Sequence, residues 1–349
     1  MNADTSKSGP AKSDGRLGSS GLGESVSIRE IESAAVRIRG VVVETPLIRA
    51  HRVSEMVGVE VFLKCENLQV TGSFKARGAS NFILSLVEKR NVDTAVAGVV
   101  TASSGNHGQA VAYAAKRVGL PCTVVVPEDV IAVKEDAIRG YGAEVVRCGV
   151  TSSERIAYAE QLARDKQLVF VPPYDHADIV AGQGSAGLEL MQSLPQVSEV
   201  FVPVGGGGLI SGVSTAVKSI AAMSSRDVRV VGVEPALAQD TYLSLLAGHA
   251  VDIGPTSTIA DGLRTSHPGS FTFPIVQRNV DEIALVSEDD ILMAMRVLFE
   301  SKLVVEPSGA TSLAAVMRAH REGYRFLGPV VCVLSGGNVS PEVFSGVLQ

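Results

Sequence analysis

The sequence predicts an α/β fold in which open, twisted, mainly parallel sheets are covered by helices on both faces. Short valine-rich runs alternate with longer helical stretches, and each run is almost continuously apolar, as strands buried on both faces are. The chain has 349 residues, of which 46% are hydrophobic, so it is long enough for two lobes. Its 35 glycines and lack of tryptophan fit helices packed closely on sheets.

The predicted elements follow a polar N-terminal tail. Residues 1–25 carry almost no apolar side chains, so we expect a disordered tail. Ser27 and Glu30 have the spacing of a capping box, and the apolar pattern after them predicts a helix that ends near Gly40. Strands are then predicted at 59–64, 96–101, 122–126, 144–147, 168–171, 199–204, 228–233 and 330–334, with helices between most of them, such as 106–117 and 209–222.

Charge and composition exclude several classes of protein. A net charge of -6 offers no basic excess for binding phosphate backbones, so we expect no nucleic-acid partner. The four cysteines form no CxxC pair, which favours a reducing compartment. No apolar run is long enough for a membrane helix, and the first residues lack the order of a signal peptide. We therefore expect a cytoplasmic protein with no membrane partner.

Four loops after predicted strands concentrate small and polar residues, at 66–75, 103–108, 205–208 and 335–338. Ligands of open parallel sheets bind beyond the carboxyl ends of the strands, so these loops are candidate sites. The glycines at 205–208 let successive backbone N–H groups converge on an anion at the start of a helix. The run lacks the Lys-Ser/Thr of a P-loop and the G-x-G-x-x-G spacing of dinucleotide sites. A phosphate cup is therefore predicted, with a closely packed turn as the alternative.

Lys75 stands a few residues beyond a predicted strand, at the start of an amphipathic helix. A lysine that loses solvation there has a lowered pKa, as formation of a Schiff base with an aldehyde requires. The alternative is an ordinary solvated lysine on the first turn of a helix.

Two carboxylates, Glu234 and Asp240, follow the strand at 228–233, with the main-chain carbonyl of Ala238 between them. These hard oxygen ligands suit Mg²⁺, Mn²⁺ or Ca²⁺. The alternative is a pair of solvated acids at a helix start.

Several motifs together, in order from about residue 27 to the end, resemble the fold-type II pyridoxal phosphate enzymes. They are the segments 71–79 (TGSFKARGA), 103–109 (SSGNHGQ), 205–208 (GGGG), 306–309 (EPSG) and 335–338 (SGGN). The branch that they resemble most is that of the threonine/serine dehydratases and serine racemases. The resemblance implies a tryptophan synthase β-like fold, pyridoxal 5'-phosphate in a cleft between two lobes, and a homodimer.

The resemblance also implies roles for the motif residues around the cofactor. Lys75 would bind the cofactor covalently and then act as the base at the substrate α-carbon. Phe74 would pack on the cofactor ring and Asn106 would hydrogen-bond its phenolic oxygen. Because a serine hydroxyl, unlike a carboxylate, does not keep a pyridine nitrogen protonated, Ser335 at that nitrogen favours β-elimination over transamination. The remaining cofactor residues implied are Gly205, Gly206, Gly207, Gly208 and Glu306.

Substrate and metal residues are implied in the same way. The residues expected near the substrate are Ser73, Ser103, His107 and Arg155, of which Ser103 would hold the α-carboxylate and His107 would not act as a base. Ser104 would supply a second acid/base on the face opposite Lys75, as racemisation needs. Glu234, Ala238 and Asp240 have the spacing of the metal-dependent members of the branch, which implies a divalent cation.

These inferences predict a dehydratase that converts L-threonine, L-serine or a related β-hydroxy amino acid to a 2-oxo acid and ammonia. The alternatives are a serine racemase and a specialised dehydratase for 3-hydroxyaspartate or for hydroxyectoine-type catabolism. Residues 26–96 and 174–349 are expected to form a large cofactor-binding domain, and residues 97–173 a small mobile domain. The sequence ends soon after its last motif, so we expect no C-terminal regulatory domain and a catabolic role.

Overall fold

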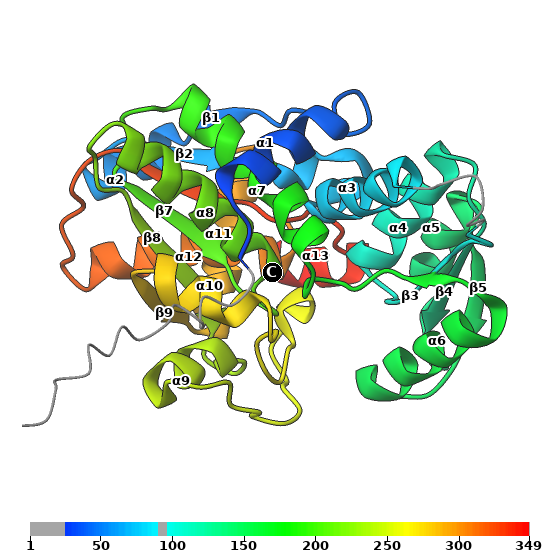
Figure 1. The fold of residues 1–349 in the computed structure, drawn as a ribbon. Helices are drawn as coiled ribbons and strands as arrows, with labels where there is room; N and C mark the ends of the chain where they lie inside the picture. The colour runs from blue at the N-terminus through cyan, green and yellow to red at the C-terminus, as the bar shows by residue number, and fades with distance from the viewer. Residues whose placement is uncertain (1–24, 90–95, 349) are drawn as a thin grey trace, which may run out of the picture.

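A computed structural model describes residues 25–89 and 96–348 (Figure 1). Residues 1–24, which hold all but the last residue of the predicted tail, lie outside the described residues. The described chain forms two sheets with helices packed around them, and the prediction of an α/β fold is confirmed. In Figure 1 the larger sheet lies on the left, and the smaller sheet lies on the right with helices α4, α5 and α6.

The larger sheet has six strands in the order β1-β2-β10-β7-β8-β9. All neighbours in it are parallel except β1 and β2, which pair antiparallel with Ile48 opposite Leu63. The six strands are β1 (Leu47–Arg49), β2 (Val61–Lys64), β7 (Glu199–Pro203), β8 (Arg229–Pro235), β9 (Glu282–Val286) and β10 (Val330–Val333).

The smaller sheet has four parallel strands in the order β5-β4-β3-β6. Its strands are β3 (Val99–Ala102), β4 (Cys122–Val126), β5 (Glu144–Arg147) and β6 (Val169–Phe170). All four come from one continuous part of the chain, between residues 99 and 170. The domain boundaries at 97 and 173 stay a prediction.

Helices surround both sheets. The longer ones begin with α1 (Ile28–Arg37), whose Ser27 and Glu30 form the predicted capping box. The α-helices after it are α2 (His51–Val57), α3 (Lys75–Glu88), α4 (Asn106–Arg117), α5 (Ala132–Gly140), α6 (Ser152–Lys166), α7 (Ala177–Ser193), α8 (Gly208–Met223), α9 (Asp240–Ala247), α10 (Thr272–Asn279), α11 (Glu288–Glu300), α12 (Pro307–Arg321) and α13 (Pro341–Leu348). Short 3-10 turns lie at η1 (Glu66–Leu68), η2 (Val70–Gly72) and η3 (Asp261–Leu263).

Helix α3 packs between the smaller sheet and helix α7. Ala79, Phe82 and Ile83 of α3 pack with Val124 of β4 and Ile179 of α7 in one buried apolar cluster. The helix that starts at Lys75 therefore contacts both halves of the fold. Within the described ranges no helix is long and apolar enough to cross a bilayer.

Candidate active site

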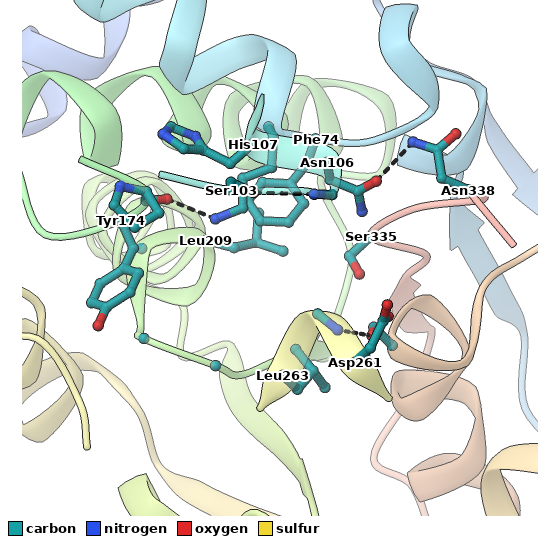
Figure 2. Close-up of a pocket in the computed structure, with 18 of the residues that line it drawn as sticks. Phe74, Ser103, Asn106, His107, Tyr174, Leu209, Asp261, Leu263, Ser335 and Asn338 are labelled. Carbon is teal, nitrogen blue, oxygen red and sulfur yellow. Dashed lines mark hydrogen bonds between the residues drawn. The ribbon is translucent and has the colours of Figure 1, made fainter. Parts of the chain in front are cut away.

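A cavity of about 290 Å³ lies at the carboxyl ends of strands from both sheets (Figure 2). The four loops singled out in the sequence all contribute to it. Its lining includes Phe74, Lys75, Ser103, Ser104, Asn106, His107, Arg155, the glycines 205–208, Glu306 and Ser335. Of the predicted cofactor and substrate residues, only Ser73 is not among the lining side chains; it is fully buried, and its backbone pairs with Gly336.

A strained turn before α3 places Lys75 in this cavity. Thr71 and Gly72 both adopt left-handed backbone conformations, with φ of 64° and 73°. A Cβ on Gly72 would lie 2.3 Å from Asn338 Oδ1, so a larger residue would displace the Asn338 side chain and would be strained at this φ. After the turn, the Phe74 N–H donates to the Ser335 carbonyl at 3.0 Å, and α3 begins at the next residue.

A buried ion network fixes the first turn of α3. The Arg77 guanidinium is fully buried and donates to both oxygens of Glu66, at 2.7 and 2.8 Å. It also donates to both oxygens of Glu189 on α7, at 2.6 and 2.7 Å. Because Arg77 lies two residues after Lys75, this network restricts the position of the lysine backbone.

The Lys75 ammonium is removed from bulk solvent. Its Nζ donates to the Pro173 carbonyl at 2.6 Å and lies 5.1 Å from the centre of the Phe74 ring. Burial lowers the pKa of Lys75 to about 8, although the nearby Glu306 acts in the opposite direction. A substantial fraction of the amine is therefore neutral near pH 8, as a nucleophile or a base must be.

A chain of amides holds Asn106 in one orientation. Its Nδ2 donates to Glu306 Oε1 at 2.7 Å, and its Oδ1 accepts from Asn338 Nδ2 at 2.7 Å. Asn338 Nδ2 also donates to the Thr71 carbonyl at 2.7 Å. Burial, followed by repulsion from Asp261, raises the pKa of Glu306 to about 8. This carboxyl is therefore mainly protonated at neutral pH.

The glycine loop presents free backbone donors at the start of α8. Within the described part of the chain, no hydrogen bond takes up the N–H groups of residues 205–208, and these residues line the cavity. Gly207 has φ of 88°, and a Cβ on Gly206 would lie 2.4 Å from the Tyr174 ring. Unpaired N–H groups at a helix N-terminus, with no side chains in the way, fit an anion such as a phosphate.

A second helix start, that of α4, brings the segment 103–109 (SSGNHGQ) to the cavity. Ser103 Oγ accepts from the Gly105 N–H at 3.2 Å, and Ser104 lines the cavity beside it. His107 is buried with its Nε2 3.1 Å from the Val171 carbonyl. Burial and the neighbouring Lys75 lower the pKa of His107 to about 3, so it is neutral at working pH. A ring with so low a pKa is a weak proton acceptor, and the expectation that His107 is not a base stays a prediction.

Two cationic side chains reach the cavity from the helices of the smaller sheet. Arg155 on α6 donates to the Val150 carbonyl at 2.9 Å. Lys134 on α5 donates to Asp261 Oδ2 at 3.0 Å, which connects α5 to η3 across the cavity. The side chains of this ion pair are 37% and 48% exposed.

The predicted metal ligands lie at the end of β8, outside the cavity lining. Glu234 accepts the N–H groups of Thr241 and Tyr242 at 2.9 and 2.8 Å. Asp240 Oδ1 accepts from Thr265, whereas Oδ2 is buried with no hydrogen-bond partner in the described structure. Burial is the main cause that raises the pKa of both carboxyls. Among the described residues, no group of three or more His, Cys, Asp or Glu side chains is arranged to hold a metal ion.

Several cavity residues were not predicted as site residues. Asn338 belongs to the SGGN motif, so its position in that motif was the available signal. Lys134 and Asp261 carried no local signal for a site, because only tertiary packing brings them to the cavity.

Comparisons with known proteins agree with this geometry. A family model described as pyridoxal-phosphate dependent enzyme matches residues 38–336. An L-threonine ammonia-lyase from Geobacter sulfurreducens is 43% identical over 320 residues, which are 91% of this chain and 77% of the relative. An L-threo-3-hydroxyaspartate ammonia-lyase from Saccharomyces cerevisiae is 37% identical over 322 residues, 92% and 95% of the two chains.

A solved structure shows the same similarity in three dimensions. The crystal structure of serine racemase from Dictyostelium discoideum superposes with a TM-score of 0.83 at 43% identity, and the match covers 90% of this chain and 99% of that one. The family match, the relatives and the cavity at the loops of both sheets lead to one conclusion: this chain belongs to the pyridoxal-phosphate dependent enzymes, in the group of ammonia-lyases and racemases of fold type II.

Proposed function

We propose that the chain is an ammonia-lyase that dehydrates L-threonine or L-serine to a 2-oxo acid and ammonia. The observation that carries the proposal is the pairing, in one cavity, of a lysine whose pKa is lowered to about 8 with a glycine loop whose N–H groups are unpaired. An aldehyde with a phosphate tail needs these two features. The identity to an L-threonine ammonia-lyase supports the choice of substrate.

When bound, pyridoxal phosphate supplies an aldehyde for the amino group and a ring that takes up the electron pair left at the α-carbon. Gly205 to Gly208 would bind its phosphate, and Asn106, held by Glu306 and Asn338, would face its phenolic oxygen. Ser103 and the N–H groups at the start of α4 would orient the substrate carboxylate. The neutral Lys75 amine would accept the α-proton.

A panel of β-hydroxy amino acids tests this function. The holoenzyme is assayed for 2-oxo acid with L-threonine, L-serine and 3-hydroxyaspartate, and we expect the highest kcat/KM with one of the first two. Lys75→Ala should lower turnover by at least about a thousandfold, because both covalent binding and proton removal depend on the amine. The proposal would be overturned if Lys75→Ala retained its turnover, or if borohydride reduction of the unaltered holoenzyme attached no cofactor to Lys75.

A second candidate function is racemisation of serine. The observation that favours it is Ser104, a hydroxyl in the cavity lining next to the Asn106 loop, together with the similarity to the Dictyostelium serine racemase. A proton returned to the other face of the α-carbon requires a second acid. Ser104→Ala should therefore abolish formation of D-serine and retain much of the dehydration. Equal loss of both activities would remove this candidate.

We also propose a divalent cation at Glu234, Asp240 and the carbonyl of Ala238. Two buried carboxyls with raised pKa values and the unpartnered Asp240 Oδ2 fit a cation, which would neutralise their charge. The cytoplasmic location and the homodimer stay predictions, which fractionation of the cell and sedimentation of the holoenzyme would test.

A further inference from the structure

The segment from Pro173 to Asp175 lies between the lysine and the glycine loop. The Pro173 carbonyl accepts from Lys75 Nζ at 2.6 Å. The next residue, Tyr174, packs against the loop so closely that a Cβ on Gly206 would meet its ring at 2.4 Å and a Cβ on Gly208 would meet its Cβ at 3.0 Å. Movement of this segment would therefore displace groups at both ends of the site.

Asp175 fixes this segment to the start of α10. Its carboxylate accepts four hydrogen bonds there: Oδ2 from the N–H and the hydroxyl of Ser270, at 3.0 and 2.9 Å, and Oδ1 from the N–H groups of Phe271 and Thr272, at 2.9 and 3.1 Å. A Cβ on Gly269 would lie 2.1 Å from Asp175 Oδ1, so the carboxylate is held tightly against the backbone. An ionised acceptor suits three backbone donors at a helix start better than a neutral one.

The residue that Asp175 holds, Thr272, in turn holds the glycine loop. Thr272 Oγ1 donates to the Gly206 carbonyl at 2.7 Å. The contact continues at Gly207, where a Cβ would lie 2.8 Å from the same hydroxyl. Asp175 thus contacts neither the cavity nor the lysine directly. It connects the segment whose Pro173 carbonyl accepts from Lys75 to Thr272, which hydrogen-bonds the glycine loop.

We propose that Asp175 is a positioning residue that sets the separation between Lys75 and the phosphate-binding N–H groups. The proposal rests on the roles proposed above for Lys75 and the glycine loop. A ligand held covalently at one end and by its phosphate at the other binds well only when that separation is right. Loss of the carboxylate charge should therefore weaken the phosphate end of the site without removing any cavity-lining side chain.

The experiment compares pyridoxal phosphate binding in the full chain and in three variants. Asp175→Asn keeps the size of the side chain but places an amide donor among N–H groups, and Thr272→Val keeps the shape but loses the hydroxyl bond to Gly206. We expect each to raise the Kd of pyridoxal phosphate by about tenfold and to shift the ³¹P resonance of the bound phosphate. Thr272→Ser, which restores the hydroxyl, should recover both values.

A matched control separates positioning from general stability. Ser287 caps α11 by accepting from the Asp290 N–H at 3.2 Å and does not line the cavity, so Ser287→Ala should lower the Tm with no change in Kd or in the ³¹P resonance. If Asp175→Asn and Thr272→Val behave like this control, the inference is wrong. If the unaltered chain itself fails to bind pyridoxal phosphate, the proposed function fails first, so the two failures are distinguishable.

Discussion

If Lys75 binds the cofactor, as proposed, its ionisation should determine when the protein can take up pyridoxal phosphate. Burial lowers its pKa from 10.5 to about 8, and only the neutral amine attacks an aldehyde. We expect the rate of covalent pyridoxal phosphate uptake by apoprotein to rise with pH and to level off above about pH 8, whereas an exposed lysine would continue to gain up to about pH 10. Stopped-flow absorbance over this pH range measures the midpoint.

Glu306 provides a control for the same prediction. The Glu306 carboxyl, whose own pKa is about 8, is partly ionised in the pH range of this midpoint, and its ionised form favours the lysine cation and so raises the pKa of Lys75. Glu306→Gln removes that charge and keeps an acceptor for Asn106, so the midpoint should move to lower pH. A midpoint that moves upward, or that lies near pH 10 in the unaltered protein, would contradict the environment described for Lys75.

At the scale of elements, strands were predictable where burial on both faces left a continuous apolar run. All eight predicted strands correspond to strands of the structure, from β2 to β8 and β10. The two that the sequence did not reveal, β1 and β9, are the edge strands of the larger sheet. Each is partly exposed, so its apolar pattern is broken: Arg49 of β1 and Glu282 of β9 are exposed.

In the site, as in the sheets, some features could be predicted from a short stretch of sequence, whereas others depend on contacts between distant parts of the chain. Lys75 and the glycine loop stand out in the sequence because the proposed chemistry needs those residue types in short motifs. The orientation of Asn106 depends instead on Glu306, 200 residues further along the chain, and on Asn338. A single sequence contains no record of such contacts, so the motif indicates the residue and only the fold supplies its partners.

The β8–α9 connection makes a prediction about pH and cations. Because burial raises the pKa of Glu234 and Asp240, ionising them costs folding stability, and this cost grows as the pH rises from below their unfolded values through their folded ones. A bound divalent cation would offset the cost. We expect Mg²⁺ added to chelated protein to raise the Tm more at about pH 8.5 than at about pH 6.

The matched variant for this experiment is Glu234→Gln with Asp240→Asn. The amides keep the size of both side chains but carry no charge, so the dependence of Tm on Mg²⁺ should disappear, and chelation should no longer destabilise the protein at high pH. An equal Mg²⁺ effect in the unaltered protein and in this double variant would show that the cation binds elsewhere.

At the scale of the whole molecule, the cavity is closed by parts of the chain that belong to different sheets. Lys134 on α5, a helix of the smaller sheet, forms an ion pair with Asp261 on η3, which packs against α12 beside the larger sheet: the Gly262 N–H donates to Ser308 at 2.9 Å. If the two halves move as separate lobes, as the sequence predicts, this ion pair stabilises the closed arrangement.

The size of that contribution follows from its exposure. A half-exposed pair contributes about 0 to 1 kcal/mol, so Lys134→Ala should raise the KM for the amino acid by no more than about fivefold, and added salt should reduce the difference. The double variant Lys134→Asp with Asp261→Lys should recover part of the loss. Arg139→Ala removes a pair with Glu135 within the same helix, which spans no cavity and should leave the KM unchanged. Steady-state kinetics at low and high salt therefore distinguish a contact between the two halves from an ordinary surface charge. If Lys134→Ala and Arg139→Ala change the KM equally, or if the exchanged pair recovers none of the loss, Lys134 has no part in closing the cavity.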